Sequence, residues 1–256
     1  MIRNLIKNKN FCYLWTGQLI SSLGDRLTQM GILTFVMVSS QDKGDKMALI
    51  TFFGLLPFLL FGPLFGALVD RYSRKNLMIL ADLARALLVL GIPFIWANTH
   101  SVLAMVAWFF ILGTFTALFT PAKMSIITNI TDKDLLLQAN SLIVTTGMIS
   151  TLVGTLIAGT LIKATGARMA FYINGLTYFV SAWLIYKIIY QSPEQPVGQP
   201  KADYGVILAD IKSGLAYVAR HQLILQLILL SCMFSVISSF GYILILNYGT
   251  TILRQG

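Results

Sequence analysis

Four ionisable side chains lie inside long apolar runs of this 256-residue sequence. Asp25 and Arg26 stand in "SSLGDRLTQ", and Asp82 and Arg85 stand in "LADLARALLVL". An ionisable group in the interior of a membrane costs about 3 kcal/mol on insertion scales and marks a functional site by default. The chemistry open to these groups is proton carriage, binding of a charged ligand and ion pairing.

The spacing of the four residues predicts different roles for the two pairs. Asp82 and Arg85 are three residues apart, so on a helix they can touch across one turn as an intramembrane ion pair. That pair could be structural or could act as a gating element. Arg26 points about 100° away from Asp25 around a helix, which leaves the carboxylate without a facing partner. Asp25 and Arg26 are therefore a candidate proton or substrate site, with a polar contact to a neighbouring helix as the alternative.

The elements that must position these residues are membrane-spanning helices. The chain is 56% hydrophobic and only 11% charged, whereas soluble domains carry about 25% charged residues. Apolar runs of about 20 residues are long enough to cross a bilayer, and runs without strict alternation favour helices over barrel strands. We therefore predict an all-α polytopic membrane protein. Its seven predicted spans lie near residues 11–38, 47–69, 76–97, 101–121, 141–163, 167–189 and 223–248.

Lys and Arg are unevenly divided between the predicted loops. Twelve fall on the side of the N-terminus, including Lys123 after the fourth predicted span, and five fall on the other side. Because cytoplasmic loops carry the excess of basic residues, we predict a multi-pass protein of the cell (inner) membrane with a cytoplasmic N-terminus. The net charge of +9 thus reflects topology, and we expect no nucleic-acid binding.

A linker separates six predicted spans from the seventh. The segment "SPEQPVGQPK" contains three prolines and no hydrophobic periodicity, and an amphipathic helix is predicted after it. The predicted domains are a six-helix bundle over 1–190, a cytoplasmic linker with the amphipathic helix over 191–222, and a seventh helix over 223–256. Thr131 and Asp134 have the spacing of a capping box, which predicts a helix start before the fifth span.

Small residues form stripes on two predicted helices. On the second span Gly62 and Gly66 lie on one four-residue ladder, and "GPLFG" is a GxxxG match. The fifth span carries a larger set: Gly147, Ser150, Gly154, Ala158 and Gly159. Such faces let helix backbones approach closely. They could serve ordinary helix packing or a sliding interface between two bundles.

The sequence offers no pattern typical of soluble enzymes. His100 and His221 have no neighbours at metal-ligand or catalytic-triad spacing, and no Walker pattern is present. We therefore expect no enzymatic activity, no cofactor and no metal site.

The segment "GALVDRYSRK", between the second and third predicted spans, resembles a signature of the major facilitator superfamily, G-x-L-x-D-R-x-x-R-K/R. The matching positions are Gly66, Leu68, Asp70, Arg71, Arg74 and Lys75. Four further segments are similar to the exporter branch that includes macrolide-efflux and enterobactin-export proteins. These segments are "YLWTGQLISSLGDRLT", "LADLARALLVL", "TPAKMSIITNITDKDLLLQANSL" and "IKSGLAYVARHQLILQLIL".

The resemblance implies twelve helices in two six-helix bundles that alternate access to a central cavity, usually driven by proton antiport. It implies a secondary active transporter that exports a small molecule, either drug-like or macrolide-like or a siderophore. Membrane lipid, the small-molecule substrate and the proton are the implied partners. It also implies that Asp70 meets a helix end in the C-terminal bundle, while Arg71, Arg74 and Lys75 complete a latch that locks the outward-facing state. The dipole of a helix N-terminus stabilises such a carboxylate.

Two departures from the family pattern argue against antiport by the usual route. The fifth span has Gly154-Thr155 followed by Ala158-Gly159 where antiporters carry a kink proline, and the fourth span lacks the arginine of drug-proton antiporters. We expect helices eight to twelve, which the stripes would face, to be missing from this sequence after the seventh helix. Two alternatives stay open: a truncated product without transport activity, and a membrane module that must pair with another half.

Overall fold

The computed structural model describes residues 2–39, 43–189, 213, 216–227, 229–231 and 233–234. The chain divides into two compact units, Met1–Gln199 and Pro200–Gly256, and the account below concerns the first. Its described residues form helices and turns without a strand. The predicted all-α class is therefore confirmed.

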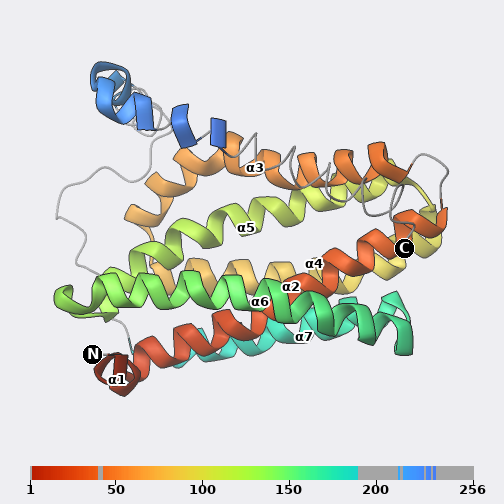
Figure 1. Cartoon of the computed structure of the whole chain (residues 1–256), viewed down its shortest axis with the longest axis horizontal. Helices are drawn as coiled ribbons and strands as arrows, with labels where there is room; N and C mark the ends of the chain where they lie inside the picture. Colours follow the sequence, from red (N-terminus) through yellow and green to blue (C-terminus); the bar gives the residue numbers. More distant parts are fainter. Residues whose placement is uncertain are drawn as a thin grey trace. The chain divides into compact units, whose positions relative to one another are not determined.

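The described residues of the first unit form one short helix, six long helices and one 3-10 turn (Figure 1). These elements are α1 (Ile2–Lys7), α2 (Lys9–Ser39), α3 (Lys43–Arg71), α4 (Arg74–Thr99), α5 (Val102–Ile130), η1 (Lys133–Leu135), α6 (Leu136–Thr165) and α7 (Ala167–Tyr186).

The helix ends follow local chemistry. The Ser101 side chain accepts a hydrogen bond from the backbone N–H of Ala104 and so caps the start of α5. Gly166 has a φ of 83°, a conformation that suits glycine, and lets the chain reverse between α6 and α7. The helix start predicted before the fifth span is present, because η1 begins at Lys133 and leads into α6 at Leu136. The capping box itself is not formed, since Oγ1 of Thr131 has no hydrogen-bond partner among the described residues.

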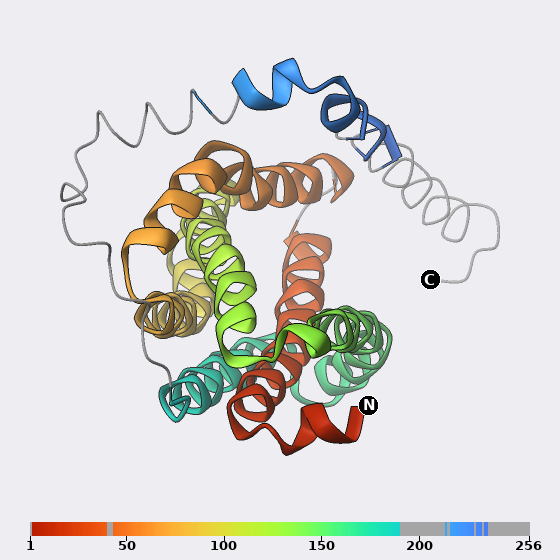
Figure 2. The same ribbon diagram turned by 90° about the vertical axis from the view of Figure 1, so that its left-hand side faces the viewer.

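The six long helices pack in a definite spatial order. Each makes its main contacts with the next in the series α3, α5, α4, α7, α2, α6. Figure 2 looks along the helices and shows α3 (orange) beside α5 (yellow-green) and α2 (red) beside α6 (green). This order leaves α3 and α6 at the two ends of the series.

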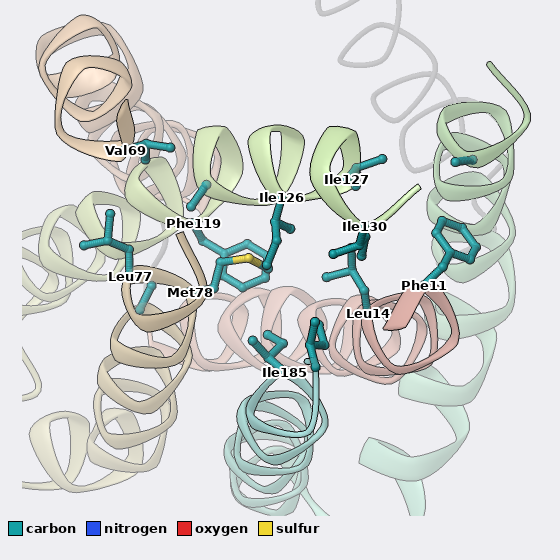
Figure 3. Packing of buried hydrophobic residues seen from close by; sticks show 14 of the residues in the cluster. Phe11, Leu14, Val69, Leu77, Met78, Phe119, Ile126, Ile127, Ile130 and Ile185 are labelled. Atoms are coloured by element: carbon teal, nitrogen blue, oxygen red, sulfur yellow. The ribbon is translucent and has the colours of Figure 1, made fainter. Parts of the chain in front are cut away.

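One hydrophobic cluster ties four helices together near the turn between α3 and α4. Leu14 of α2, Met78 of α4, Ile126 of α5 and Ile185 of α7 are all buried in it, and their side chains point toward one another (Figure 3). Close packing of this kind fixes helix positions, since interiors leave few voids. We call this end of the unit, where Asn8, Arg74, Ile130 and Ile188 lie, the signature end.

The outer surface of the unit is strongly apolar. Leu59 is 78% exposed and Leu103 is 77% exposed, a pattern suited to lipid rather than water. In the part of the chain that the structure describes, five helices are long and apolar enough to cross a membrane: Leu49–Arg71, Arg74–Thr99, Val102–Ile130, Lys133–Thr165 and Ala167–Tyr186. Helix α2 has 31 residues, but its polar residues around Asp25 lower its mean hydropathy.

The second unit carries the remaining predicted elements. An apolar helix covers Gln222–Ser231, which is the start of the predicted seventh span. The rest of that span, and most of the predicted linker and amphipathic helix, lie outside the described residues. The three domain boundaries stay predictions.

Candidate functional site

The interior of the first unit holds a buried ion pair. Arg85 donates a hydrogen bond to the Oδ1 of Asp82 one helical turn earlier on α4. Both side chains are buried. Opposite charges at this spacing lower each other's cost of burial, although desolvation remains expensive. The ion pair that the sequence predicts between Asp82 and Arg85 is thus formed in the structure.

The guanidinium of Arg85 lies close to two aromatic rings on neighbouring helices. The Cζ of Arg85 lies 4.2 Å from the ring centroid of Phe119 on α5 and 4.5 Å from that of Tyr178 on α7. A cation over an aromatic face is attracted by about 0.5–2 kcal/mol, more where water is excluded. Arg85 is therefore fixed by three helices.

Tyr178 joins the ion pair to the other predicted site. Its hydroxyl donates a hydrogen bond to Oδ1 of Asp25 on α2, while its ring faces Arg85. The structure thus brings Asp25 into one group with Asp82 and Arg85, although Asp25 stands more than fifty residues before them in the sequence. We call Asp25, Asp82, Arg85, Lys123 and Tyr178 the charge cluster.

A close approach of α2 and α7 places Asp25 beside Tyr178. A Cβ atom on Gly24 would lie 2.2 Å from Oδ1 of Asn174, so no larger residue fits between the helices here. The amide of Asn174 donates to Oγ1 of Thr28 at 2.7 Å. These contacts between α2 and α7 fix the position along α7 beside which Asp25 lies.

Lys123 corrects the predicted boundary of the fourth span. The sequence placed it in a loop after residue 121, but α5 continues to Ile130. Its Nζ lies 5.9 Å from the ring centroid of Phe119, and it is close enough to interact electrostatically with Arg85, Asp25 and Asp82. Lys123 therefore belongs to the charge cluster instead of to a loop.

Arg26 faces a different neighbour from Asp25. A Cβ atom on Gly154 of α6 would lie 2.9 Å from its Cγ, so its stem packs directly on that glycine. Its Nη1 donates to Oε1 of Gln29 at 2.9 Å. The predicted divergence of Asp25 and Arg26 around α2 is thus visible as contacts with two different helices.

The signature residues divide into exposed and engaged groups. Asp70 is exposed at the end of α3. Arg74 donates a hydrogen bond to Oδ1 of Asn129, and Nζ of Lys75 donates to the carbonyl of Ile188 at 2.7 Å. These two basic residues therefore fasten the start of α4 to the ends of α5 and α7. Arg71, the last residue of α3, is half-buried.

The small residues predicted as a stripe on α6 form two rows, one buried and one open. On α6 the row Ser150, Gly154 and Ala158 is buried inside the unit. A Cβ atom added to Gly147 or Gly159 on the adjacent row would meet nothing within 4 Å.

Gly62 and Gly66 on α3 have the same open surroundings as Gly147 and Gly159 on α6. Cβ atoms at Gly62 and Gly66 would also meet nothing within 4 Å. The tight contact of α3 is elsewhere, where a Cβ on Gly113 would lie 2.1 Å from the carbonyl oxygen of Gly54. The open glycines therefore sit on α3 and α6, the two end helices of the packing series.

Sequence reasoning missed Tyr178 and the position of Lys123. A usable signal for Tyr178 was present, because Asn174, Tyr178 and Ser181 recur at intervals of four and three along the sixth predicted span. That spacing lines one helical face with polar groups. Within the described residues, no three His, Cys, Asp or Glu side chains gather as a possible metal site.

Comparison of the sequence with known proteins identifies the family of this chain. The model of the Major Facilitator Superfamily matches residues 14–255. The uncharacterized MFS-type transporter YfiS of Bacillus subtilis (strain 168) is 29% identical over 233 residues, which cover 91% of this chain and 55% of that protein.

Two relatives carry names that state an export role. The putative bacilysin exporter BacE of Bacillus subtilis (strain 168) is 27% identical over 181 residues, covering 70% of this chain and 44% of that protein. Macrolide efflux protein A of Streptococcus pyogenes is 35% identical over 114 residues, covering 44% and 28%. The chain spans about half the length of the curated relatives that it matches. Since the family match extends over nearly the whole sequence, the chain belongs to the major facilitator superfamily and is a polytopic membrane protein.

Proposed function

We propose that this chain works in a secondary active transporter that exports a small molecule by alternating access. The observation that carries the proposal is the charge cluster, which places two carboxylates and two cations in the interior of an apolar helix bundle. Burying these groups is costly, and in membrane proteins such groups mark substrate or proton pathways. Export, rather than uptake, is supported by the names of two relatives, a putative bacilysin exporter and a macrolide efflux protein.

Asp25 is the proposed proton and substrate residue of the cluster. Among the described residues its carboxylate has no basic nitrogen within 4.0 Å, and it accepts a hydrogen bond from the neutral hydroxyl of Tyr178. A proton can therefore join or leave Asp25 without breaking an ion pair. Asp82 lacks this freedom because Arg85 neutralises it. Asp82 and Arg85 then act as the fixed pair around which Asp25 changes charge.

Asp70 is the proposed latch residue. It is exposed, whereas Arg74 and Lys75 are already engaged with α5 and α7. An exposed carboxylate is free to meet the positive end of a helix from a second bundle. Gly66 and Arg71, at the same turn, complete the proposed latch.

The second bundle is itself part of the proposal. The open glycines on α3 and α6 offer two faces for close helix contact, and the partner is either a C-terminal bundle or another chain. We propose a location in the inner membrane with the N-terminus in the cytoplasm, based on the distribution of basic residues. Drug-like, macrolide-like and siderophore molecules are candidate substrates.

Accumulation in intact cells tests the proposed function. Cells expressing the chain are loaded with labelled compounds ordered by charge: a macrolide, neutral amphiphiles, carboxylates and a siderophore. We expect lower accumulation of at least one compound with the wild type than with Asp25→Asn, and no change with Lys163→Gln, an exposed lysine near the end of α6. Equal accumulation of every compound in all strains would overturn the proposal and favour a transport-inactive product.

Co-expression tests the remaining alternative, that the chain must pair with another half. If the chain exports nothing alone but gains activity with a separately expressed C-terminal bundle from a relative, it is a module that pairs with another half. Cysteine crosslinking at Gly62 provides a direct check, since its face is open.

A further inference from the structure

The hydroxyl of Tyr178 is buried and has an ionisable partner. The side chain is 4% exposed and packs in a hydrophobic cluster with residues of α4 and α5. A phenol hydroxyl in such a place needs a hydrogen-bond acceptor, and a backbone carbonyl would serve. Here the acceptor is Oδ1 of Asp25. The hydroxyl therefore lies where it can influence the charge of that carboxyl group.

The other polar side chains of α7 near this contact are engaged elsewhere. The amide nitrogen of Asn174 donates to Oγ1 of Thr28 at 2.7 Å, and its Oδ1 accepts from Oγ1 of Thr177 at 2.9 Å. Among the described residues, Tyr178 is thus the one side chain that donates a hydrogen bond to Asp25.

Three glycines of α2 fix its register against α7. Gly17, Gly24 and Gly31 recur every seven residues, and Cβ atoms on them would lie 3.3, 2.2 and 2.8 Å from side-chain atoms of α7. These atoms belong, in the same order, to Ser181, Asn174 and Phe171. Because so close a contact extends along both helices, sliding one past the other would create clashes. The packing of the two helices therefore holds Tyr178 beside Asp25.

Charged groups of two other helices act on Asp25 from a greater distance. Asp82 and Arg85 of α4 form an ion pair, and each interacts electrostatically with Asp25. Lys123 of α5 does so as well. Among the described residues, no basic nitrogen lies within 4.0 Å of the Asp25 carboxylate. The hydroxyl of Tyr178 is its direct partner.

The helix α6 and the next residue of α2 leave this arrangement unchanged. Arg26 follows Asp25 in the sequence, but its stem packs on Gly154 of α6. The one charged residue of α6 is Lys163, nine positions beyond Gly154 and near the end of that helix.

We propose that Tyr178 is a positioning residue for proton exchange at Asp25: its hydroxyl stabilises the ionised carboxylate and so sets the pH at which Asp25 takes up a proton. The inference rests on the proposed role of Asp25 in export and adds the residue that tunes it. A hydrogen bond to a charged acceptor favours the charged form. The tyrosine keeps its own proton, since a phenol in water ionises only at about pH 10. The proton that moves joins or leaves Asp25.

Infrared titration of the purified full chain in lipid vesicles tests this proposal without any transport step. Protonated Asp25 has a carboxylic C=O band, which is identified by its absence from Asp25→Asn. Tyr178→Phe removes the hydroxyl and keeps the ring beside Arg85. We expect the midpoint pH of the Asp25 band to be about one unit higher in Tyr178→Phe than in the wild type. Loss of one hydrogen bond to a charged group changes the proton affinity about tenfold.

A control variant on the same helix makes the result specific. Tyr172→Phe removes an exposed phenol hydroxyl of α7 and should leave the midpoint unchanged. A merely structural role of Tyr178 would affect stability and leave the midpoint in place, so an unchanged or lower midpoint in Tyr178→Phe overturns the proposal. Absence of an Asp25-dependent band from both proteins, over the pH range in which they stay folded, overturns it as well.

A second measurement on the wild type decides if Tyr178→Phe does not fold. When Asp25 takes up a proton, the hydroxyl of Tyr178 loses its ionised acceptor, so the C–O stretching band of this tyrosine should change. We expect a tyrosine band that changes at the same pH as the Asp25 carboxyl band, and whose change is lost in Asp25→Asn. No tyrosine band with this behaviour would overturn the proposal.

The titration decides this proposal independently of export. A raised midpoint in a chain that moves no compound out of cells would keep the role of Tyr178 and remove the export function. An unchanged midpoint in an active exporter would remove the role of Tyr178 and keep the export function.

Discussion

The hydroxyl of Tyr178 donates a hydrogen bond to the carboxylate of Asp25, and this contact joins α7 to α2. The same phenol ring lies 4.5 Å from the Cζ of Arg85, which pairs with Asp82 on α4. One tyrosine thus connects two carboxylates that are far apart in the sequence. Asp25 also interacts electrostatically with both members of the ion pair.

Asp82→Asn should lower the free energy of unfolding by about 3–5 kcal/mol, because it leaves the buried charge of Arg85 without its counter-ion. Denaturant unfolding in detergent, followed by the fluorescence of the four tryptophans, measures the loss.

The matched control for this prediction is the double variant Asp82→Leu with Arg85→Met. It removes both charges and retains apolar volume, so it should recover most of the lost stability. A double variant as unstable as Asp82→Asn would contradict the assignment of the loss to an uncompensated charge.

Gly113→Ala should destabilise the bundle by about 1–3 kcal/mol, as expected for overpacking. Its new methyl group would lie 2.1 Å from the carbonyl oxygen of Gly54, so α3 and α5 must move apart. Gly62→Ala is the control, because a Cβ there meets nothing within 4 Å; it should be neutral or gain up to about 1 kcal/mol of helix propensity. Thermal unfolding compares the two, and equal effects would argue against the observed helix contact.

Much of the fold could be predicted because each long helix is a continuous apolar run. Composition and run length indicated the all-α class. The signature residues, predicted around the connection of two spans, occupy the end of α3 and the start of α4. The end of the fourth span was wrong because "TPAKMSIITNI" contains a proline and a lysine. Pro121 stays inside α5, and Lys123 lies on the same helix with its ammonium near the ring of Phe119.

The candidate site was predicted only where its contacts are local. The pair Asp82 and Arg85 is three residues apart, so its spacing alone suggests the contact. The link from Asp25 to Tyr178 spans two helices and depends on the glycine contact at Gly24. No local pattern encodes which helix face meets another. The buried row of α6 was likewise indistinguishable in sequence from the open row beside it.

Asn10→Ala should increase hydrogen exchange at the backbone amide of Ile189. The side chain of Asn10 accepts from that amide at 3.0 Å and donates to the carbonyl of Ile189 at 2.9 Å, so it holds the segment after α7 at the signature end. Loss of these bonds should speed exchange by up to about tenfold. Asn98→Ala, which removes only a local bond to Phe94, should leave the Ile189 amide unchanged; equal acceleration by both variants would contradict this role.

Asp70→Asn should impair export without preventing membrane insertion. The side chain is exposed and the neighbouring Lys75 keeps its bond to Ile188, so the bundle itself should stay folded. Loss of the charge removes only the proposed contact with a second bundle. Cellular accumulation, normalised to the amount of protein in the membrane, measures the effect. Unchanged efflux at normal expression would refute the latch role.

Proton movement in everted membrane vesicles is the most direct test of the central claim, that the charge cluster couples a proton to export of a small molecule. A pH-sensitive dye reports proton release when a transported compound from the cellular screen is added. The account predicts proton flux with the wild type and with Lys163→Gln, and none with Asp25→Asn. Proton flux that persists in Asp25→Asn would contradict it.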